Sequence, residues 1–496
     1  MKESDSVALQ SWLSTPNTND KTHTKADISD DLKILDDETL GRCIIANESI
    51  PKDELIMKIP KLYLLNYLNV LKHISYWNQG LNIFLKERIS NYSSELFESP
   101  QDNITDLYCS IDVQQLLKLT THQLLTLYLV LEKRRGANSF WFPLLRCLPE
   151  LPEYDEIPMT WIIGSSDKRA THAKIFNLLP KEVIDESNAQ LKKFFKDTTT
   201  VDSFFTSRQD LDVNVKEEEY LWAWLAINTR SLYYQNPTYL PVSTTKDKEI
   251  SSITMVPYVD FVNHKCEESN AIAKQSKSGY EVTTTAEIGE GEHVWFTYGP
   301  HNDDFLQCEY GFSTSTLEND EEDDEALTYT SFNKYNTIEL TNILSKLLEN
   351  PKKKMVVEWL KQTGYYGDYT IGVDDILFDF GSMDMSCAPS HRTRIAIAAL
   401  IEDEKLFQFS ETSQAYQCPQ KLEKFYQGYN DGEYYAKTEA LILSKILRKI
   451  ESDLDGKLDK LTEIRNEIDE EDEQSEMKIR VVEKLIWNRK VMILSV

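Results

Sequence analysis

Apolar residues gather in two short runs near the start of the chain, and these runs predict strands. They are Leu40–Ala46 and Glu54–Pro60, which are rich in Ile and Met and have prolines at their boundaries. Residues 1–36 are polar and poor in large apolar residues except around Val7–Leu13. We therefore expect a short N-terminal helix and then a loose stretch before the first strand.

After these runs the apolar positions favour helices. Thr120-x-x-Gln123 is a capping-box pattern, which places a helix start just before an apolar run that ends at Gly136. The segments Lys181–Lys196 and Glu217–Tyr233 are also predicted to be helical. Between Trp141 and Pro158 the repeated prolines instead predict a loop.

Strand patterns return over residues 253–298. Asn270–Gln275 and Tyr280–Thr285 flank Lys277-Ser-Gly279, which is a plausible hairpin turn. The segment Glu287–Glu292 is then expected to turn the chain into a last strand, His293–Tyr298. The chain thus has two strand-rich stretches with a predicted helical insert between them.

An acidic and amide-rich run, Glu318–Glu325, follows and predicts an exposed boundary. Beyond it, apolar residues keep a helical period in groups that extend to the end of the chain. The groups are Leu340, Ile343, Leu344, Leu347 and Leu348, then Leu441, Ile442, Lys445, Ile446 and Ile450, and finally Ile479, Val482, Leu485 and Ile486. The sequence therefore predicts an almost wholly helical C-terminal part.

The charge balance limits the kinds of partner. The formal net charge of −28 argues against a nucleic-acid binder that relies on a basic surface. It favours basic protein partners, although an acidic balance can equally serve solubility alone. The hydrophobic content of 41% is enough for a large core and excludes wholesale disorder.

The cysteines and the N-terminus indicate a compartment. The 7 cysteines include no C-x-x-C pair, so we expect no metal site, and an unpatterned set suits a reducing compartment. The first residues lack the basic and apolar regions of a signal peptide, and no apolar run is long enough to span a bilayer. We expect a cytoplasmic protein with no membrane partner, and the sequence leaves a nuclear pool open.

Two short motifs carry the strongest functional signal. Asn263-His264 ends the segment that starts at Val256, and Tyr298-Gly299 is followed by Tyr310-Gly311-Phe312. No metal spacing, nucleophile elbow or phosphate loop accompanies them. The order of these motifs resembles the SET-domain methyltransferases, and most of all the split-SET branch related to the Rubisco large-subunit methyltransferases.

The resemblance implies an α+β fold with a defined domain order. It places a β-rich SET domain at residues 37–315, split by a helical insert at about 65–235. An all-α C-terminal substrate-binding domain would occupy residues 326–496, and residues 1–36 would form an N-terminal helix and loose segment. The resemblance also takes in Asn138–Pro143, which matches the family's insert region. No cysteine-rich zinc tail follows Phe312, which disfavours a zinc-stapled histone methyltransferase.

Methyl transfer to lysine requires a neutral amine. A lysine pKa of about 10.4 leaves a small neutral fraction at pH 7, and reaching that form costs about 4–5 kcal/mol. A site lessens this cost by desolvating the amine beside the cofactor's sulfonium charge and by aligning the reacting atoms in a narrow channel. Tyr298 fits the role of a phenol that holds the methyl group by weak C–H···O contacts. The alternative is a core tyrosine whose hydroxyl bonds the backbone.

The resemblance assigns cofactor and channel residues. Those predicted to bind S-adenosyl-L-methionine are Gly41, Arg42, Arg230, Asp260, Asn263, His264 and Tyr298, and Tyr298 is the catalytic residue. Tyr310 and Phe312 are predicted to line the substrate-lysine channel. Simpler roles stay open for several of these residues: a surface turn at Gly41-Arg42, an ion pair of Arg230 with residues 217–219, and a turn cap at Asp260. His264 could likewise be a satisfied buried histidine.

Two positions depart from the family pattern. Cys43 stands where relatives usually carry the second glycine of Gly-x-Gly, which leaves a different bend at Gly41 open. Asp303 stands where relatives usually carry asparagine before the next helix, and Asn302 offers that amide with a shift of one residue.

We therefore predict a protein-lysine N-methyltransferase that acts on a non-histone protein. Ribosomal proteins and translation elongation factors lead the possible substrates by analogy, and their lysine-rich surfaces would suit an acidic enzyme. We expect a monomer without direct nucleic-acid contact. Protein-histidine methylation and a non-catalytic SET-like binding module are the alternatives. The target lysine and the degree of methylation are not evident from the sequence.

Overall fold

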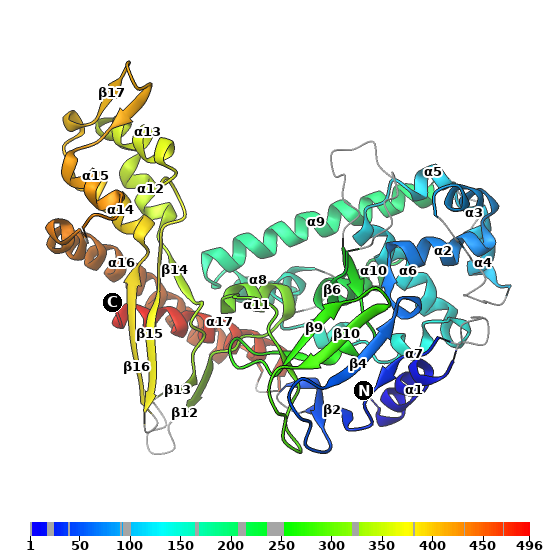
Figure 1. The fold of residues 1–496 in the computed structure, drawn as a ribbon. Helices are drawn as coiled ribbons and strands as arrows, with labels where there is room; N and C mark the ends of the chain where they lie inside the picture. The colour runs from blue at the N-terminus through cyan, green and yellow to red at the C-terminus, as the bar shows by residue number, and fades with distance from the viewer. Residues whose placement is uncertain are drawn as a thin grey trace. The chain divides into compact units, whose positions relative to one another are not determined.

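Helices and strands of this chain gather into two units, which we describe separately. The computed structural model describes residues 2–16, 24–37, 40–89, 92, 101–163, 168–206, 215–235, 252–319, 327–379, 382–430, 432–469 and 471–496. The first unit consists of Met1–Asp155 with Asn188–Gly299, and the second of Glu156–Ser187 with Pro300–Val496. Figure 1 labels their helices and strands.

The central sheet of the first unit joins strands from both strand-rich stretches. Its order is β1-β4-β10-β9, from β1 (Asp27–Ile28), β4 (Leu55–Pro60), β10 (Gly279–Thr284) and β9 (Ala271–Gln275), and every neighbouring pair is antiparallel. Tyr280 pairs with Ile59, so residues more than two hundred positions apart lie side by side (Figure 1). A Cβ at Gly279 would stand 1.9 Å from the Ile59 carbonyl oxygen, so only glycine fits this crossing.

Among the described residues of the first unit, the other strands form three small sheets. They are β2 (Leu32–Asp37) with β3 (Gly41–Ala46), β5 (Leu65–Asn66) with β7 (Ile253–Met255) and β6 (Ser231–Tyr233), and β8 (Asn263–His264) with β11 (Trp295–Phe296). The strand β2 lies where we expected a loose stretch. Leu32 and Ile34 face inward and are buried while Lys33 is exposed, so a short alternating pattern was present in a mostly polar region.

The helical insert contains the helices that the capping signals predicted. Its helices are α2 (Tyr67–Trp77), α3 (Gln79–Lys86), α4 (Asn103–Ser110), α5 (Val113–Leu116), α6 (Thr121–Arg135), α7 (Phe142–Leu145), α9 (Lys181–Thr206) and α10 (Glu217–Arg230), and α1 (Glu3–Ser14) precedes it. Thr120 and Gln123 form the predicted capping box, and Gly136 ends α6 at a φ of +63°. The expected loop after Trp141 is in fact broken by α7 and by single turns of 3-10 helix, which the prolines begin.

Helix α10 ends earlier than expected. Residues Ser231–Tyr233 form β6 instead of a last helical turn, because Leu232 pairs with Thr254 of β7. A strand partner that is distant in sequence overrides the local helical pattern here. Arg230 is therefore the last residue of the helix.

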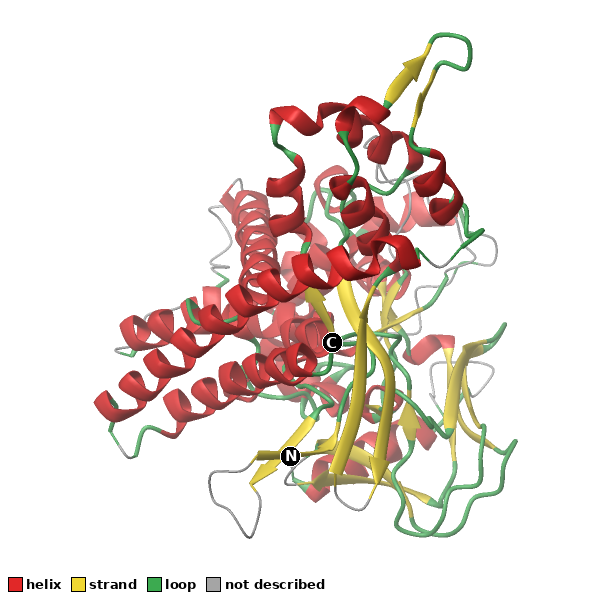
Figure 2. Cartoon of the chain, turned by 90° about the vertical axis from the view of Figure 1, so that its left-hand side faces the viewer, coloured by secondary structure: helices red, strands yellow, loops and turns green. Residues whose placement is uncertain are grey.

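The second unit is mostly helical but also contains strands. Its helices are α8 (Arg169–Phe176), α11 (Asp303–Tyr310), α12 (Thr341–Leu348), α13 (Lys354–Thr363), α14 (His391–Ile401), α15 (Gln420–Tyr426), α16 (Glu433–Glu467) and α17 (Glu473–Leu494), besides the start of α9. Its strands are β12 (Thr316–Asn319), β13 (Leu327–Ser331), β14 (Thr337–Glu339), β15 (Thr370–Asp379), β16 (Ser382–Pro389), β17 (Gln408–Ser410) and β18 (Ala415–Gln417). The α+β class is confirmed (Figure 2). The expectation of an all-α C-terminal part is wrong, because strands β13 to β18 lie there.

The strands that the sequence analysis missed are mainly β15 and β16. They pair antiparallel, and a bulge between Val373 and Asp375 shifts the register. The bulge moves the inward-facing positions by one residue, which breaks the alternation of apolar side chains that reveals a strand. The acidic run that we expected to be an exposed boundary lies largely outside the described residues.

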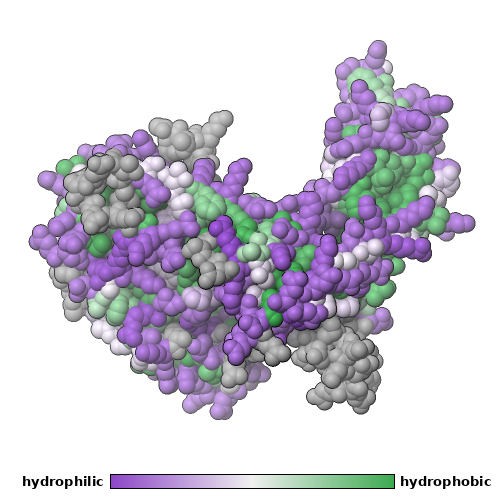
Figure 3. All heavy atoms as spheres, turned by 180° about the vertical axis from the view of Figure 1, so that it is seen from behind, coloured by the Kyte–Doolittle hydropathy of each residue, from purple (hydrophilic) through white to green (hydrophobic). Residues whose placement is uncertain are grey.

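Large apolar side chains fill the interior of the second unit. One cluster packs Trp359, Leu360 and Ile395 of α13 and α14 with Leu443 of α16. Another joins α16 and α17 to Trp161 and to α8. Hydrophilic residues cover most of the face drawn in Figure 3, as the high charged fraction of 27% requires. Within the described ranges, no helix is long and apolar enough to cross a membrane.

Candidate active site

The first functional motif forms one strand, β8, and the second follows its neighbouring strand, β11. β8 and β11 pair in parallel, with Trp295 opposite Asn263 and Phe296 opposite His264, and the Lys265 amide donates to the Phe296 carbonyl at 2.7 Å. A parallel pair needs a crossover connection, and the hairpin of β9 and β10 lies in that connection. The Asn-His and Tyr-Gly segments are therefore part of one structure.

His264 holds the backbone of Tyr298. Its Nδ1 accepts a hydrogen bond from the Tyr298 N–H at 2.9 Å, so in the neutral ring the proton is on Nε2, which faces Cys266 Sγ at 3.4 Å. The two rings lie 5.0 Å apart, centre to centre. His264 is buried, and these contacts make it a satisfied histidine that also orients the proposed catalytic residue.

Tyr298 is anchored at both ends. Its hydroxyl donates to the Val262 carbonyl oxygen at 2.8 Å, while its amide bonds His264. The side chain is half-buried rather than enclosed in the core. The hydroxyl thus has the backbone partner that the simpler alternative required, and its oxygen keeps lone pairs for a further contact.

Asn263 links the motif to the loop before β3. Its Nδ2 donates to the Leu40 carbonyl oxygen at 3.1 Å. Gly41, the next residue, has a φ of +64°, and no atom lies within 4 Å of a Cβ built there. The left-handed backbone, rather than lack of space, is therefore what favours glycine at the predicted bend.

Arg42 has a partner that the sequence did not reveal. One terminal nitrogen of its guanidinium donates to both carboxylate oxygens of Glu153, at 2.7 and 3.0 Å. Glu153 is distant in sequence and lies in a proline-rich segment without a motif, so no sequence signal indicated it. Cys43 is buried against Leu35 of β2, and burial with the charges of Asp37 and Asp36 raises its pKa to about 11.

Arg230 and Asp260 form a buried pair. Arg230 donates through one terminal nitrogen to the Asp260 carbonyl at 3.1 Å and to its Oδ2 at 3.4 Å. Burial raises the pKa of Asp260 to about 6 against the opposing charge of Arg230. The alternative pairing of Arg230 with residues 217–219 is not observed, because Glu219 binds Arg134.

Three buried polar atoms of the candidate cofactor residues retain unused hydrogen-bonding capacity. Asp260 Oδ1 and the Nε atoms of Arg230 and Arg42 are buried without a hydrogen-bond partner. Burial lowers the pKa of Arg230, but Asp260 and, to a smaller extent, Tyr154 and Tyr298 outweigh it and raise the pKa. A carboxylate acceptor and guanidinium donors together match the ammonium and carboxylate of an amino-acid group. These residues therefore fit the methionyl part of the predicted cofactor.

The predicted channel residues belong to the second unit. Tyr310 is the last residue of α11, and its ring centre lies 6.0 Å from that of Phe312. Gly311 between them has a φ of +81°, and a Cβ there would meet Ile157 Cγ1 at 3.0 Å. Burial raises the pKa of Tyr310. Tyr298 belongs to the first unit, so the shared lysine channel stays a prediction.

Asn302 and Asp303 have separate roles at the start of α11. Asn302 is the N-cap, since its Oδ1 accepts from the Phe305 amide at 2.9 Å. Asp303 is 1% exposed and accepts hydrogen bonds from residues that follow it in sequence, among them Thr314 and Asn488. Among the described residues, no group of three or more His, Cys, Asp or Glu side chains could hold a metal ion.

Comparisons with known proteins support the resemblance. The SET domain profile matches residues 41–299, and the profile of the ribosomal lysine N-methyltransferase 2 C-terminal domain matches residues 336–496. Ribosomal lysine N-methyltransferase 2 of Saccharomyces cerevisiae is 24% identical over 92% of this chain and 91% of its own length. Ribosomal lysine N-methyltransferase set11 of Schizosaccharomyces pombe is 22% identical over 83% of this chain and 80% of its own.

A solved structure shares the fold. Rubisco LSMT bound to AdoMet aligns with a TM-score of 0.51 and 13% identity, covering 98% of this chain and 91% of that one. The expected SET fold with its helical insert is thereby confirmed, with a C-terminal region that is mostly helical rather than all-α.

Proposed function

Because this chain belongs to the SET-domain family and is a protein-lysine methyltransferase, we propose that its substrate is a ribosomal protein. Two relatives that match most of its length are named ribosomal lysine N-methyltransferases. The net charge of −28 supports the same class, since proteins that bind ribosomal RNA carry basic surfaces. A lysine-rich protein of the translation machinery is the proposed partner.

We assign the cofactor site to the first unit. The proposed contacts to S-adenosylmethionine come from Gly41, Arg42, Arg230, Asp260, Asn263, His264 and Tyr298. Asp260 offers a carboxylate to an ammonium group and Arg230 offers donors to a carboxylate. The bound cofactor supplies the methyl group on a sulfonium. His264 contributes by holding the Tyr298 backbone at 2.9 Å.

The setting of Tyr298 favours the reactive form of the substrate amine. Its half-buried position removes water from an amine beside it, and that amine would also lie beside the sulfonium charge, which disfavours a second positive charge. Both effects lower the pKa of the substrate lysine. The Tyr298 hydroxyl would contact the methyl group, and Tyr310 and Phe312 would form the aromatic walls of the channel, as the resemblance implies.

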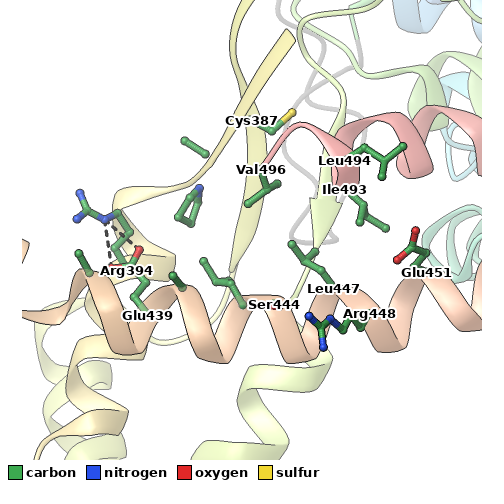
Figure 4. Close-up of a pocket in the computed structure, with 15 residues that line it drawn as sticks. Cys387, Arg394, Glu439, Ser444, Leu447, Arg448, Glu451, Ile493, Leu494 and Val496 are labelled. Atoms are coloured by element: carbon green, nitrogen blue, oxygen red, sulfur yellow. Dashed lines mark hydrogen bonds and ion pairs between the residues drawn. The ribbon is translucent and has the colours of Figure 1, made fainter.

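We propose that the C-terminal unit binds the protein substrate. A cavity of about 530 Å³ lies on it, between the end of β16, the first turn of α14, one face of α16 and the end of α17. Figure 4 shows Leu447 and Ile493 in its apolar lining and the Arg394–Glu439 pair at one end. Its size suits a few side chains of a bound segment.

One contact supports this function above all others. The 2.9 Å hydrogen bond between His264 and the Tyr298 amide joins the two motifs whose combination suggested the chemistry. The test is incubation of the protein with labelled S-adenosylmethionine and ribosomal proteins from cells that lack the enzyme. A labelled ribosomal protein, modified on lysine by mass spectrometry and absent with Tyr298→Phe, is the expected result.

The alternatives give different outcomes in the same experiment. Label on histidine would favour a histidine methyltransferase, and label only on elongation factors would move the substrate to that class. A binding module would give no label and no heat in calorimetry with S-adenosylhomocysteine. Any of these three results would overturn the proposed lysine methylation of a ribosomal protein.

A further inference from the structure

The carboxylate of Asp303 connects the two sides of the turn that carries Tyr310 and Phe312. Asp303 is the first residue of α11, and Tyr310 is the last. Its Oδ1 accepts from the amide of Thr314 at 2.8 Å and from the hydroxyl of Thr314 at 3.1 Å. Its Oδ2 accepts from the hydroxyl of Ser315. One side chain therefore closes the loop from the start of α11 to the residues that follow Phe312.

Three asparagine side chains complete the surroundings of this carboxylate. Asn333 donates to Oδ1 at 3.0 Å, and Asn336 and Asn488 donate to Oδ2 at 3.0 Å each. With Thr314 and Ser315, each carboxylate oxygen accepts from three donors. The amide of Asn488 comes from α17, so the connection extends beyond the loop itself.

The orientation of each asparagine is fixed by a second hydrogen bond. Asn333 Oδ1 accepts from the Tyr335 amide at 3.0 Å, Asn336 Oδ1 from the Asp303 amide at 2.9 Å, and Asn488 Oδ1 from the Tyr329 hydroxyl at 2.8 Å. Each oxygen is thus occupied, and each NH₂ group is the part that faces Asp303. The site requires an acceptor on both sides, which a carboxylate offers and an amide does not.

No cation forms an ion pair with Asp303 among the described contacts. Neutral donors therefore satisfy this buried charge, which is a stable arrangement for an ionised carboxylate. Burial lowers the pKa of Lys484 of α17, and the charge of Asp303 opposes this shift without an ion pair between the two groups. The neighbouring Asp304 is different, because it pairs with Arg489.

The turn itself is tightly packed. Gly311 has a left-handed backbone and allows no Cβ without pressing on Ile157, and the Gln307 side chain donates to the Glu156 carbonyl at 2.8 Å. A shift of Thr314 would therefore not be absorbed locally and would rotate Phe312 and Tyr310. Small displacements of channel groups reduce rates strongly.

We propose that Asp303 is a positioning residue for the aromatic pair Tyr310 and Phe312. This rests on the proposed role of that pair in the lysine channel. Asp303 acts through the backbone of Thr314 and Ser315 and does not touch the substrate. The carboxylate is required because three asparagines around it already supply the donors.

The test compares Asp303→Asn with Asp304→Asn in the full chain. Asp303→Asn replaces one carboxylate oxygen by an NH₂ group, which would face the donors that now bind that oxygen. Asp304→Asn removes a carboxylate of the same helix that pairs with Arg489 and, within the described residues, makes no hydrogen bond to Thr314. We expect kcat/KM for the protein substrate to fall about tenfold or more in Asp303→Asn. We also expect a changed ratio of mono-, di- and trimethylated product, with unchanged affinity for S-adenosylhomocysteine.

A purely structural role would give a different result. It would lower the melting temperature in both variants and leave the product ratio of each at the wild-type value. Equal product ratios and equal kcat/KM in the two variants would overturn the proposal. If Asp303→Asn does not fold, Thr314→Val removes a single hydroxyl contact and should shift the product ratio in the same direction.

Hydrogen exchange separates this proposal from the proposed function. The Thr314 amide is protected by Asp303, so exchange of the segment 311–315 should quicken in Asp303→Asn and stay at the wild-type rate in Asp304→Asn. Unchanged exchange in Asp303→Asn would overturn the positioning role. Faster exchange in a protein that methylates no ribosomal substrate would instead contradict only the proposed function.

Discussion

The imidazole of His264 accepts a hydrogen bond from the backbone N–H of Tyr298 at 2.9 Å. The Tyr298 hydroxyl in turn donates to the Val262 carbonyl, two residues before His264. Tyr298 is thus held at its backbone and at its hydroxyl by one short segment. An anchored phenol loses little freedom when a substrate binds, which suits a group that must align reacting atoms.

Tyr298→Phe should separate binding from transfer. Only the hydroxyl is lost, so the ring still packs beside His264 and the cofactor dissociation constant should stay within about twofold, while kcat should fall by about a hundredfold or more. Calorimetry with S-adenosylhomocysteine and single-turnover transfer measure the two effects. Unchanged turnover would remove Tyr298 from the mechanism.

Arg230→Ala should weaken cofactor binding. The change removes the proposed donor to the cofactor carboxylate and leaves the buried Asp260 without its partner, so we expect the dissociation constant to rise at least about tenfold. Arg134→Ala is the matched control, because that arginine pairs with Glu219 at a partly exposed position in the same unit. Equal cofactor affinity in the two variants would contradict the role of Arg230.

The pKa of Asp260 predicts a pH dependence of cofactor binding. Burial raises this pKa from 3.8 to about 6, with Arg230 opposing the shift. As the pH falls through about 6, the carboxylate gains a proton and loses its charge, so cofactor affinity should decrease. Calorimetry at pH values above and below 6 compares cofactor affinity in wild type and in Asp260→Asn. The affinity of the variant should not change across this pH range, because it lacks the carboxylate.

The same group affects stability in the opposite direction. Because the folded pKa lies above the unfolded one, protonation of Asp260 favours the fold. Its stabilising contribution is complete below 3.8 and is lost as the pH rises through about 6. Between pH 3.8 and about 6, the wild type should therefore lose stability as the pH rises, whereas Asp260→Asn should not. Denaturant unfolding of both proteins measures this difference. A pH-independent difference between the two proteins would contradict the raised pKa.

Gly279→Ala should disrupt the central sheet. A Cβ at this position would lie 1.9 Å from the Ile59 carbonyl oxygen, so β4 and β10 would have to separate. We expect a loss of about 3 kcal/mol or more in the free energy of unfolding, measured by chemical denaturation.

Gly456→Ala is its control. Gly456 lies inside α16, and no atom stands within 4 Å of a Cβ built there. Alanine in a helix interior should raise the free energy of unfolding by about 1 kcal/mol. A similar loss in both glycine variants would show that the clash at Gly279 is not the cause.

The sequence predicted the elements whose signals are local. The capping box at Thr120, the hairpin of β9 and β10, and the strands at β3 and β4 depend on side chains within a few residues of one another, so their patterns are visible in one dimension. The bulged strand β15 and the short strand β6 were missed. Their conformation depends on a partner strand, which local patterns do not contain.

The sequence predicted which residues belong to the candidate site but not the contacts between them. The family resemblance supplied residues such as Asn263, His264 and Tyr298, but neither it nor the spacing showed that His264 would hold the Tyr298 amide. Glu153 was missed because its segment has no motif and its partner Arg42 is far away in sequence.

The sequence by itself indicated the family through a resemblance that short motifs carry, and that resemblance implied the fold class and the candidate site residues. Only the tertiary structure decided the partners of the charged groups. Arg230 bonds Asp260 rather than residues 217–219, and Asp303 is surrounded by neutral donors rather than by a cation. The physical reason is that burial and hydrogen-bond satisfaction are properties of the packed chain, where residues far apart in sequence meet.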